Sequence, residues 1–331
     1  MKRLLVIIIL ALMFIGMGLI TYSENQIEQQ LPISQKTLYR VDSGSSFNKV
    51  LVDLEQRDWL EHKFWLKLYA KLNPQITGIK AGTYQIPANA SLKQLFAILV
   101  SGAEHQFSIT FVEGSTFKEW LNQLAETQHI HFTLADMDRE QILKLLTKDY
   151  QHPEGLFFPD TYSFTAGSKD IDILKQAHQR MLKELADSWQ NKAKDLPYNN
   201  SYEALIMASM IEKETAQIDE QPLIAAVFIT RLAKNMRLQT DPTIIYGLGD
   251  RYTGDITYAN MREKTAYNTY RINGMPPTPI AMPGKSAIEA SLHPANSKYL
   301  YFVSKGNGEH YFSTTLKEHN KAVDKYIRGK K

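Results

Sequence analysis

The sequence contains no cysteine among its 331 residues. This absence excludes disulfides, thiolate nucleophiles, iron–sulfur clusters and cysteine-based zinc sites. It does not assign a redox compartment, because a chain without thiols suits both a reducing cytoplasm and an oxidising space outside it. Charge of one sign is also scarce, since 38 Lys and Arg face 35 Asp and Glu for a net charge of +3. We therefore do not expect the chain to bind nucleic acid.

Several catalytic motifs are missing as well. The sequence has no Walker-type phosphate loop, no His-Glu-x-x-His and no Gly-x-Ser-x-Gly. Three histidines lie near the C-terminus, at His293, His310 and His319, but their spacing matches no standard set of zinc ligands. We expect neither a metal nor another cofactor. Composition is that of a folded protein, with 44% hydrophobic and 22% charged residues.

An uncharged apolar run occupies residues 4–22, directly after Lys2 and Arg3. At a rise of about 1.5 Å per residue, a helix of this length spans roughly the hydrocarbon core of a bilayer. A cleaved signal peptide also begins with basic residues, but its apolar region is usually about 7–15 residues long and ends in a small-x-small site, which residues 21–24 do not provide. A buried core helix is the other alternative. We interpret the run as a retained anchor.

The positive-inside rule predicts the topology of this anchor. Lys2 and Arg3 should stay in the cytoplasm, which places residues 23–331 on the far side of the membrane. In a bacterium, this corresponds to a single-pass protein of the inner, cytoplasmic membrane whose main body lies in the periplasm, beside the cell wall.

Helix caps and apolar spacing predict the elements that follow. Residues 23–36 are polar and lack periodicity, which indicates a short tether. Three later segments each show an extended run, a cap and an apolar-periodic helix, with caps at Ser46, at Ser91 and at Ser115 or Thr116. Residues 37–87 thus read strand, helix, helix, strand. Predicted helices cover residues 59–72, 117–126, 139–146 and 171–193.

Two glutamates end an apolar helical stretch, and they raise the question of catalysis. The side chains of residues 205–211 fall all around a helical wheel, which predicts a buried helix. At about 100° per residue, Glu212 and Glu214 point to nearly opposite faces. Burial raises the pKa of a carboxyl, and a protonated carboxyl can cleave a glycosidic bond as a general acid. The alternative is a solvated Glu-Lys-Glu turn without catalytic function.

Loops rich in Pro, Gly, Asn, Thr and Tyr follow the glutamates, over residues 237–249, 265–284, 293–304 and 310–320. Such loops combine hydrogen-bonding groups with flat rings on stiff backbone, which suits a polyhydroxylated chain. The earlier loop at residues 152–164 is rich in aromatics, and it either lines a carbohydrate groove or packs into the core.

Five motifs together resemble the YceG-like family of endolytic murein transglycosylases: "EKETA", "RLQTDPTIIYG", "TAYNTY", "GMPPTPIAMPG" and "YLYFV" followed by "HYFSTTLKEHN". The resemblance implies an inner-membrane lyase that cleaves the β-1,4 bond between N-acetylmuramic acid and N-acetylglucosamine inside nascent glycan strands. The product ends in 1,6-anhydro-muramic acid, and cleavage terminates glycan elongation. Peptidoglycan strands are the implied substrate, and peptidoglycan synthases and penicillin-binding proteins are the implied partners.

The resemblance also implies residue roles. The family's catalytic glutamate matches Glu214, which leaves Glu212 as a supporting residue. The sequence departs from the family pattern at Thr278, where relatives often have Gly, and at Met282, where they often have Asn. Thr resists the positive φ that Gly allows, while the prolines around it remain. Residues 37–87 resemble a LysM-like domain, a fold associated with chains that contain N-acetylglucosamine.

One carboxyl can suffice for a lytic transglycosylase, because the attacking nucleophile is the C6 hydroxyl of the muramic acid itself. Candidates for binding the sugars are Gln239, Asp241, Tyr267, Asn268 and Tyr301, each of which could instead hold loops together. A hydrolytic muramidase would need a second carboxylate, with Asp241 or Glu263 as possibilities. A non-catalytic wall-binding scaffold is the third alternative.

The expected fold class is therefore α+β. An N-terminal transmembrane helix (1–22) and a linker (23–36) lead to a small LysM-like β-α-α-β module (37–105). A mixed α+β catalytic domain (106–331) should then carry the catalytic Glu near the end of a buried helix.

Overall fold

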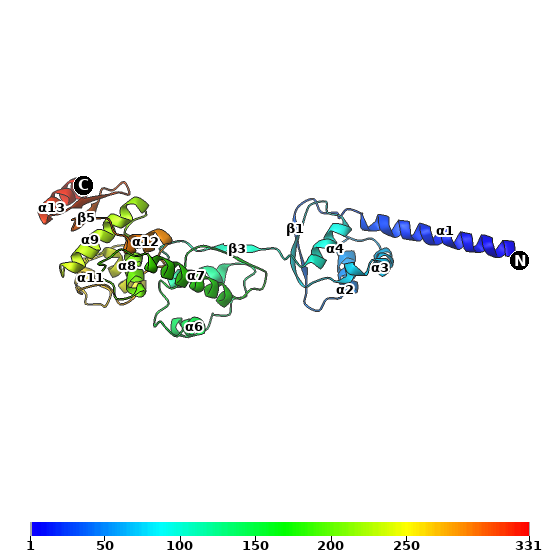
Figure 1. Ribbon diagram of the computed structural model, residues 1–331, viewed down its shortest axis with the longest axis horizontal. Helices are drawn as coiled ribbons and strands as arrows, with labels where there is room; N and C mark the ends of the chain where they lie inside the picture. The colour runs from blue at the N-terminus through cyan, green and yellow to red at the C-terminus, as the bar shows by residue number, and fades with distance from the viewer. Residues whose placement is uncertain (1, 331) are drawn as a thin grey trace. The chain divides into compact units, whose positions relative to one another are not determined.

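A computed structural model describes residues 2–330 (Figure 1). The chain divides into two compact units. The N-terminal unit comprises the residues up to Phe107 together with Ser163–Gly167, and the C-terminal unit comprises Ser108–Tyr162 and the residues from Ser168 onward. Helices and short strands alternate in both units, which confirms the mixed α+β class.

Helix α1 (Lys2–Ile27) covers the apolar N-terminal run. Its most apolar window has a mean hydropathy of 2.9, and none of that window is buried. Among residues 2–330, it is the one helix long and apolar enough to cross a membrane. This exposure fits a membrane anchor, because exposed apolar surface of that extent is unfavourable in water.

The segment expected to be a tether instead belongs to the core of the N-terminal unit. Ile27, Leu31 and Ile33 are all buried there. The backbone N–H of Leu31 donates to the carbonyl of Ala90 at 2.8 Å, and the N–H of Asn89 donates to the carbonyl of Ile33 at 2.8 Å. Sequence polarity did not reveal this packing, because the apolar side chains are few and their partners lie far along the chain.

Strand β1 (Thr37–Val41), helices α2 (Phe47–Gln56) and α3 (Lys63–Leu72) and strand β2 (Gly82–Ile86) follow in the predicted order, with a 3₁₀ turn at Pro74–Thr77 and helix α4 (Leu92–Ser101) after them. The two strands pair antiparallel, with Tyr39 opposite Tyr84. Ser46 and Ser91 cap α2 and α4 as predicted. Helix α3 begins later than the predicted residue 59, because Asp58, at φ 57°, turns the chain after α2.

The C-terminal unit is mainly helical. Strand β3 (Phe107–Thr110) pairs with β4 (Thr161–Phe164), and the division between the two units falls within both strands. Strand β5 (Tyr301–Ser304) pairs antiparallel with β6 (His310–Ser313) inside the C-terminal unit. Thr116, not Ser115, caps α5 through a capping box. The α-helices are α5 (Phe117–Glu126), α6 (Arg139–Leu146), α7 (Asp170–Gln190), α8 (Ser201–Glu214), α9 (Gln221–Ala233), α10 (Asp241–Leu248), α11 (Tyr258–Arg262), α12 (Lys285–Leu292) and α13 (Leu316–Tyr326).

Helix α8 forms the centre of this unit. Every residue from 204 to 211 is buried, as the apolar wheel predicts. Helices α7, α9, α10 and α12 all pack against it, and Figure 1 shows α8 among these neighbours. The aromatic loop packs into the same unit through Leu156 and Phe157, which are both buried. The core therefore holds α8 rigidly up to its last residue, Glu214.

Candidate active site

A cavity of about 540 Å³ opens at the C-terminal end of α8. Its walls come from α8, α9, the loop before α10, the β5–β6 hairpin and α13. Polar and aromatic side chains dominate the lining, and they include Glu214, Arg231, Gln239, Asp241, Tyr270, Tyr301, His310, His319 and Asn320. The cavity therefore brings together four of the predicted site residues, namely Glu214, Gln239, Asp241 and Tyr301.

Glu214 is the last residue of α8, and its carboxyl faces this cavity. Burial is the largest effect on the Glu214 carboxyl, and it raises the pKa to about 7. The hydroxyl of Thr240 donates a hydrogen bond to Oε1, which lowers the pKa. The negative charge of Asp241 raises it, and the positive charge of Arg231 lowers it. Burial outweighs the two lowering contributions, so Glu214 keeps its proton to a higher pH than an exposed glutamate does.

The loop before α10 fixes Thr240 beside Glu214. The backbone N–H of Thr240 donates to the hydroxyl oxygen of Thr269 at 3.0 Å. Gln239 adopts a left-handed backbone conformation with φ 52°, and its N–H donates to the carbonyl of Thr269 at 3.3 Å. This constrained turn leaves the Gln239 side chain exposed at the cavity.

Arg231 lies in the otherwise apolar helix α9, and its guanidinium is held by backbone carbonyls. Nε donates to the carbonyl of Leu300 and Nη1 to that of Leu238, each at 2.7 Å. The guanidinium carbon is 5.2 Å from the ring centre of Tyr301, and that ring stacks on His319 at 5.2 Å. Burial and the nearby Arg231 charge both lower the pKa of His319, which keeps this imidazole neutral near pH 7.

Asp241 opens α10 and accepts a hydrogen bond from Tyr270, whose hydroxyl donates to Oδ1 at 2.7 Å. This contact holds the Asp241 side chain at the wall of the cavity. Glu263, the other candidate second carboxylate, binds Arg251 at 2.9 Å and does not line the cavity.

Glu212 contacts a different part of the unit. Its Oε2 accepts the backbone N–H of Gly284 at 3.0 Å, just before α12. Burial raises the pKa of this carboxyl as well. The adjacent Lys213 donates to the carbonyl of Gly114 at 3.0 Å. Glu212 thus braces the end of α8 against the proline loop, while Glu214 faces the cavity, as their spacing predicts.

Two predicted sugar-binding residues, Tyr267 and Asn268, do not line the cavity. Asn268 is buried, and its amide donates to the carbonyls of Asn260, Met261 and Glu263 at 3.1, 3.2 and 2.7 Å. The hydroxyl of Tyr267 lies 2.8 Å from that of Thr278. Both side chains therefore hold loops together, Asn268 through backbone carbonyls and Tyr267 through the hydroxyl of Thr278.

The two departures from the family pattern fit the proline loop. Thr278 is not among the described residues with positive φ, so it needs no left-handed conformation. Met282 makes two backbone hydrogen bonds, because its N–H donates to Ser115 and its carbonyl accepts from Gly114, each at 2.8 Å. The backbone of this loop is therefore paired without an asparagine at position 282.

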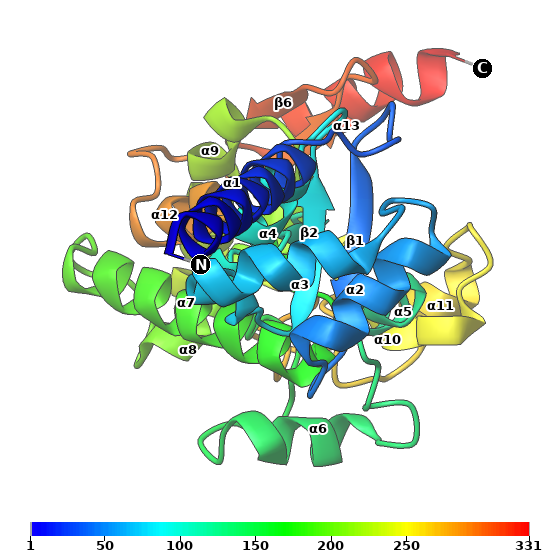
Figure 2. The same ribbon diagram turned by 90° about the vertical axis from the view of Figure 1, so that its right-hand side faces the viewer.

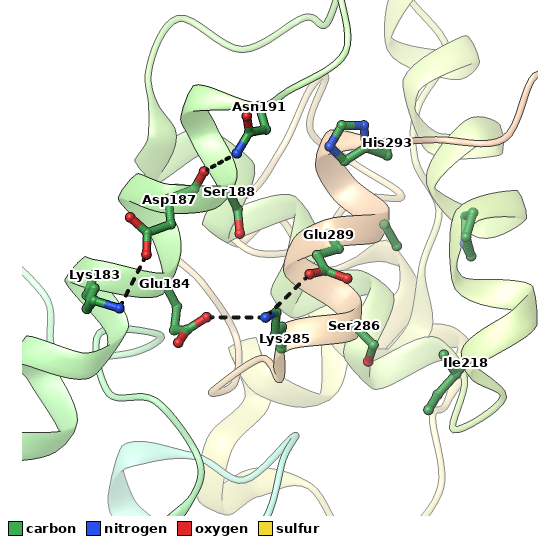
Figure 3. A pocket seen from close by; sticks show the side chains of 12 residues that line it. Lys183, Glu184, Asp187, Ser188, Asn191, Ile218, Lys285, Ser286, Glu289 and His293 are labelled. Atoms are coloured by element: carbon green, nitrogen blue, oxygen red, sulfur yellow. Dashed lines mark hydrogen bonds and ion pairs between the residues drawn. The ribbon is translucent and has the colours of Figure 1, made fainter.

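A second cavity, of about 560 Å³, lies between α7 and α12 (Figure 3). Its charged side chains pair with one another: Lys183 with Asp187 at 3.5 Å, and Lys285 with Glu184 at 3.9 Å and with Glu289 at 3.8 Å. Each of these carboxylates therefore already pairs with a lysine, and no predicted site residue lines this cavity. The cavity at Glu214 is the better candidate for chemistry.

Sequence motifs did not point to Arg231 or Tyr270 as cavity residues, nor to Thr240 as the hydrogen-bond partner of Glu214. A single arginine inside the apolar stretch of α9 is the signal that could have found Arg231. A further buried carboxyl, Glu154, also escaped prediction. It accepts the N–H of Phe117 at 2.9 Å and the hydroxyl of Tyr246 at 3.0 Å, and burial raises its pKa to about 7.

Comparison with known proteins identifies relatives over most of the chain. Residues 39–325 match the YceG-like family. The chain is 32% identical to the endolytic murein transglycosylase of Bacillus subtilis strain 168, over 95% of this chain and 91% of the relative. It is 28% identical to that of Streptococcus pneumoniae serotype 2, over 88% of this chain and 58% of the relative.

A crystal structure of a YceG-like protein from Listeria monocytogenes is also similar. It shares 29% identity with a TM-score of 0.53, over 87% of this chain and 99% of that protein. The match to residues 39–325 covers most of the sequence, and the relatives align over nearly the same length. The chain therefore belongs to the YceG-like family.

Proposed function

We propose that the chain is an endolytic lytic transglycosylase of peptidoglycan. It cleaves the β-1,4 bond between N-acetylmuramic acid and N-acetylglucosamine within nascent strands, leaves 1,6-anhydro-muramic ends and so terminates elongation. The observation that carries this proposal is the carboxyl of Glu214, which has a pKa of about 7 and faces a cavity lined by polar and aromatic side chains. The relatives from Bacillus and Streptococcus are endolytic murein transglycosylases, which supports it.

Glu214 acts first as the acid. Its proton passes to the glycosidic oxygen while the bond from that oxygen to C1 of the muramic acid breaks, which leaves positive charge on the ring. The Glu214 carboxylate then takes the proton of the C6 hydroxyl, whose oxygen bonds to C1 and closes the anhydro ring. No water is consumed, and the carboxyl is again protonated. Proximity favours this intramolecular attack over attack by solvent.

Other cavity residues assist through position and charge. The carboxylate of Asp241 on the cavity wall stabilises the positive charge on the sugar ring. The hydroxyl of Tyr270 holds this carboxylate in place. The flat ring of Tyr301 offers a stacking surface for a sugar, and the exposed amide of Gln239 offers hydrogen bonds to hydroxyl or acetamido groups.

Hydrolysis is the second candidate, because Asp241 lies in the same cavity as Glu214. A muramidase would use this second carboxylate on a water or on the sugar itself. Its product would be one water heavier than the anhydro product and would end in a reducing sugar.

The N-terminal part of the chain places the catalytic domain next to its substrate. Helix α1 anchors the protein as a single span in the inner membrane, with the body in the periplasm. The β1-α2-α3-β2 order supports a LysM-like module that binds N-acetylglucosamine-containing strands. Peptidoglycan synthases and penicillin-binding proteins, which make the strands, are the partners.

The test compares the full-length chain with Glu214→Gln and Glu212→Gln on purified glycan strands, with products read by mass spectrometry. Glu214→Gln should lose about 10²–10⁴-fold in rate, because a general acid is removed, and should still bind strands. Glu212→Gln should retain more activity, since Glu212 contacts Gly284 and not the cavity. Full activity in Glu214→Gln would refute the assignment, and hydrated products from the wild type would favour the muramidase. A wild type that binds strands without turnover would indicate a scaffold.

A further inference from the structure

Helix α3 (Lys63–Leu72) has an unusual surface for a helix in a periplasmic module. Its buried face consists of Leu66 and Ala70, which pack into the core of the N-terminal unit. Three other stripes follow around the helix at four-residue spacing. One is basic, one is apolar and one is aromatic, and they comprise Lys63, Lys67 and Lys71; Phe64, Leu68 and Leu72; and Trp65 and Tyr69.

The apolar stripe is exposed at both ends and half-buried at Leu68, although it is hydrophobic. Phe64 is 62% exposed and Leu72 is 52% exposed. Neither side chain is covered by another part of the N-terminal unit. An apolar stripe beside a row of lysines is the pattern of a helix that lies in a membrane interface, where the apolar side chains enter the acyl region and the lysines extend toward the headgroups.

The position of α3 beside α1 gives independent support. Helix α3 packs against α1, and the ring centres of Tyr22 and Trp65 are 4.5 Å apart. Tyr22 ends the apolar run of α1, so it lies where a membrane-spanning helix meets the headgroups. Trp65 therefore lies at the same depth. Figure 2, which looks nearly along α1, shows α3 running across the direction of that helix.

We propose that α3 is an interfacial helix that lies on the leaflet from which α1 emerges. Phe64, Leu68 and Leu72 enter the boundary of the acyl chains. Lys67 and Lys71 contact the phosphates of anionic phospholipids, and Trp65 and Tyr22 form part of an aromatic belt. Together, α1 and α3 fix the orientation of the N-terminal unit on the bilayer, which a single helix could not do. This inference depends on α1 crossing the membrane and not on the proposed catalysis.

The absence of cysteine permits a direct test by site-directed spin labelling. Three exposed aromatic residues form a matched set: Phe14 in α1 at 73% exposure, Phe64 in α3 at 62% and Tyr258 in α11 at 80%. Each is replaced singly by cysteine in the full-length chain, labelled with a nitroxide and reconstituted in vesicles of phosphatidylcholine and phosphatidylglycerol. Collisions of the label with oxygen, which enriches in the bilayer, are compared with those of a water-soluble nickel complex.

We expect the label in Phe64→Cys to favour oxygen over nickel, as the label in Phe14→Cys does, and the label in Tyr258→Cys to show the reverse. Lys67→Glu combined with Lys71→Glu should move the label of Phe64→Cys toward water in vesicles that contain phosphatidylglycerol, and less in pure phosphatidylcholine. A label in Phe64→Cys with the accessibility of Tyr258→Cys overturns the proposal. Spin–spin broadening that disappears on dilution with unlabelled chain also overturns it, because this face would then bind a second copy.

Discussion

Replacing Glu214 by glutamine should stabilise the C-terminal unit at alkaline pH while it removes the proposed acid. In the folded chain, burial raises the pKa of this carboxyl from 4.5 to about 7. Because the pKa is raised, the folded state holds the proton more tightly than the unfolded state does. The stabilising contribution is complete below pH 4.5 and is lost as the pH rises to about 7 and beyond.

The size of the effect follows from the two pKa values. Each tenfold change in proton affinity is worth about 1.36 kcal/mol, so the whole rise corresponds to about 3 kcal/mol. About 2.5 kcal/mol of this develops between about pH 5 and about pH 8. These are upper limits, because Glu214 is partly exposed in the cavity. Glutamine carries no such penalty, and its carbonyl can still accept the hydroxyl of Thr240.

Thermal unfolding of the full chain in detergent measures the difference. The wild type and Glu214→Gln are compared at the two pH values in a background where Trp59 and Trp65 are phenylalanine, so that fluorescence reports Trp120 and Trp189 of the C-terminal unit. For a unit of this size, 1 kcal/mol shifts Tm by roughly 2–4 °C. The Tm difference should therefore grow by about 5–10 °C from about pH 5 to about pH 8.

Glu309→Gln is the matched control for this experiment. Glu309 lies on the surface, and its hydrogen bond with Lys305 lowers its pKa, so this variant should gain no stability at about pH 8. A Tm difference between wild type and Glu214→Gln that is equal at both pH values would refute the raised pKa. The proposed acid would then lack the property on which its role depends.

Three further changes test the surroundings of the cavity. Thr240→Val should move the alkaline limb of the pH–rate profile to higher pH. The hydrogen bond from Thr240 lowers the pKa of Glu214, so its loss raises that pKa. Asn268→Ala should cost about 1–3 kcal/mol in urea unfolding, because it strands buried carbonyls, and should leave KM nearly unchanged. Gly155→Ala should cost about 2–4 kcal/mol, because Gly155 has φ 79° and a Cβ would lie 2.4 Å from Cβ of Pro279; an unchanged Tm would contradict this geometry.

Local signals were sufficient to predict much of the fold. Caps at Ser46 and Ser91 mark where helices begin, because a side-chain oxygen must satisfy the free N–H groups of the first turn. The wheel of residues 205–211 predicts a helix buried on all sides. The order of strands and helices in residues 37–87 follows from the same periodicities. These features depend on neighbours within one or two helical turns.

Features that depend on distant partners were not predicted. Leu31 and Ile33 look like isolated apolar residues in a polar tether, and only their pairing with residues 89–92 buries them. Tyr267 and Asn268 have the chemistry of sugar-binding residues, but the hydroxyl of Thr278 and backbone carbonyls engage their polar groups. Their proposed contact with sugars stays a prediction, although the motif that contains them was correct about the family.

A single carboxyl that must first give a proton and then take one needs a pKa near the working pH, because a distant value favours one half of the cycle and slows the other. The surroundings of Glu214 supply this balance from opposing effects. Asp241 and Arg231 act on its charge in opposite directions, Thr240 stabilises the ionised form, and burial decides the outcome at about 7. Removing either charged neighbour should therefore shift the optimum pH of cleavage. The optimum should rise without Arg231, which lowers the pKa of Glu214, and fall without Asp241, which raises it. A glycosidase with two carboxyls separates the two roles by keeping one acid protonated and the other ionised, whereas the mechanism that we propose places both roles on Glu214.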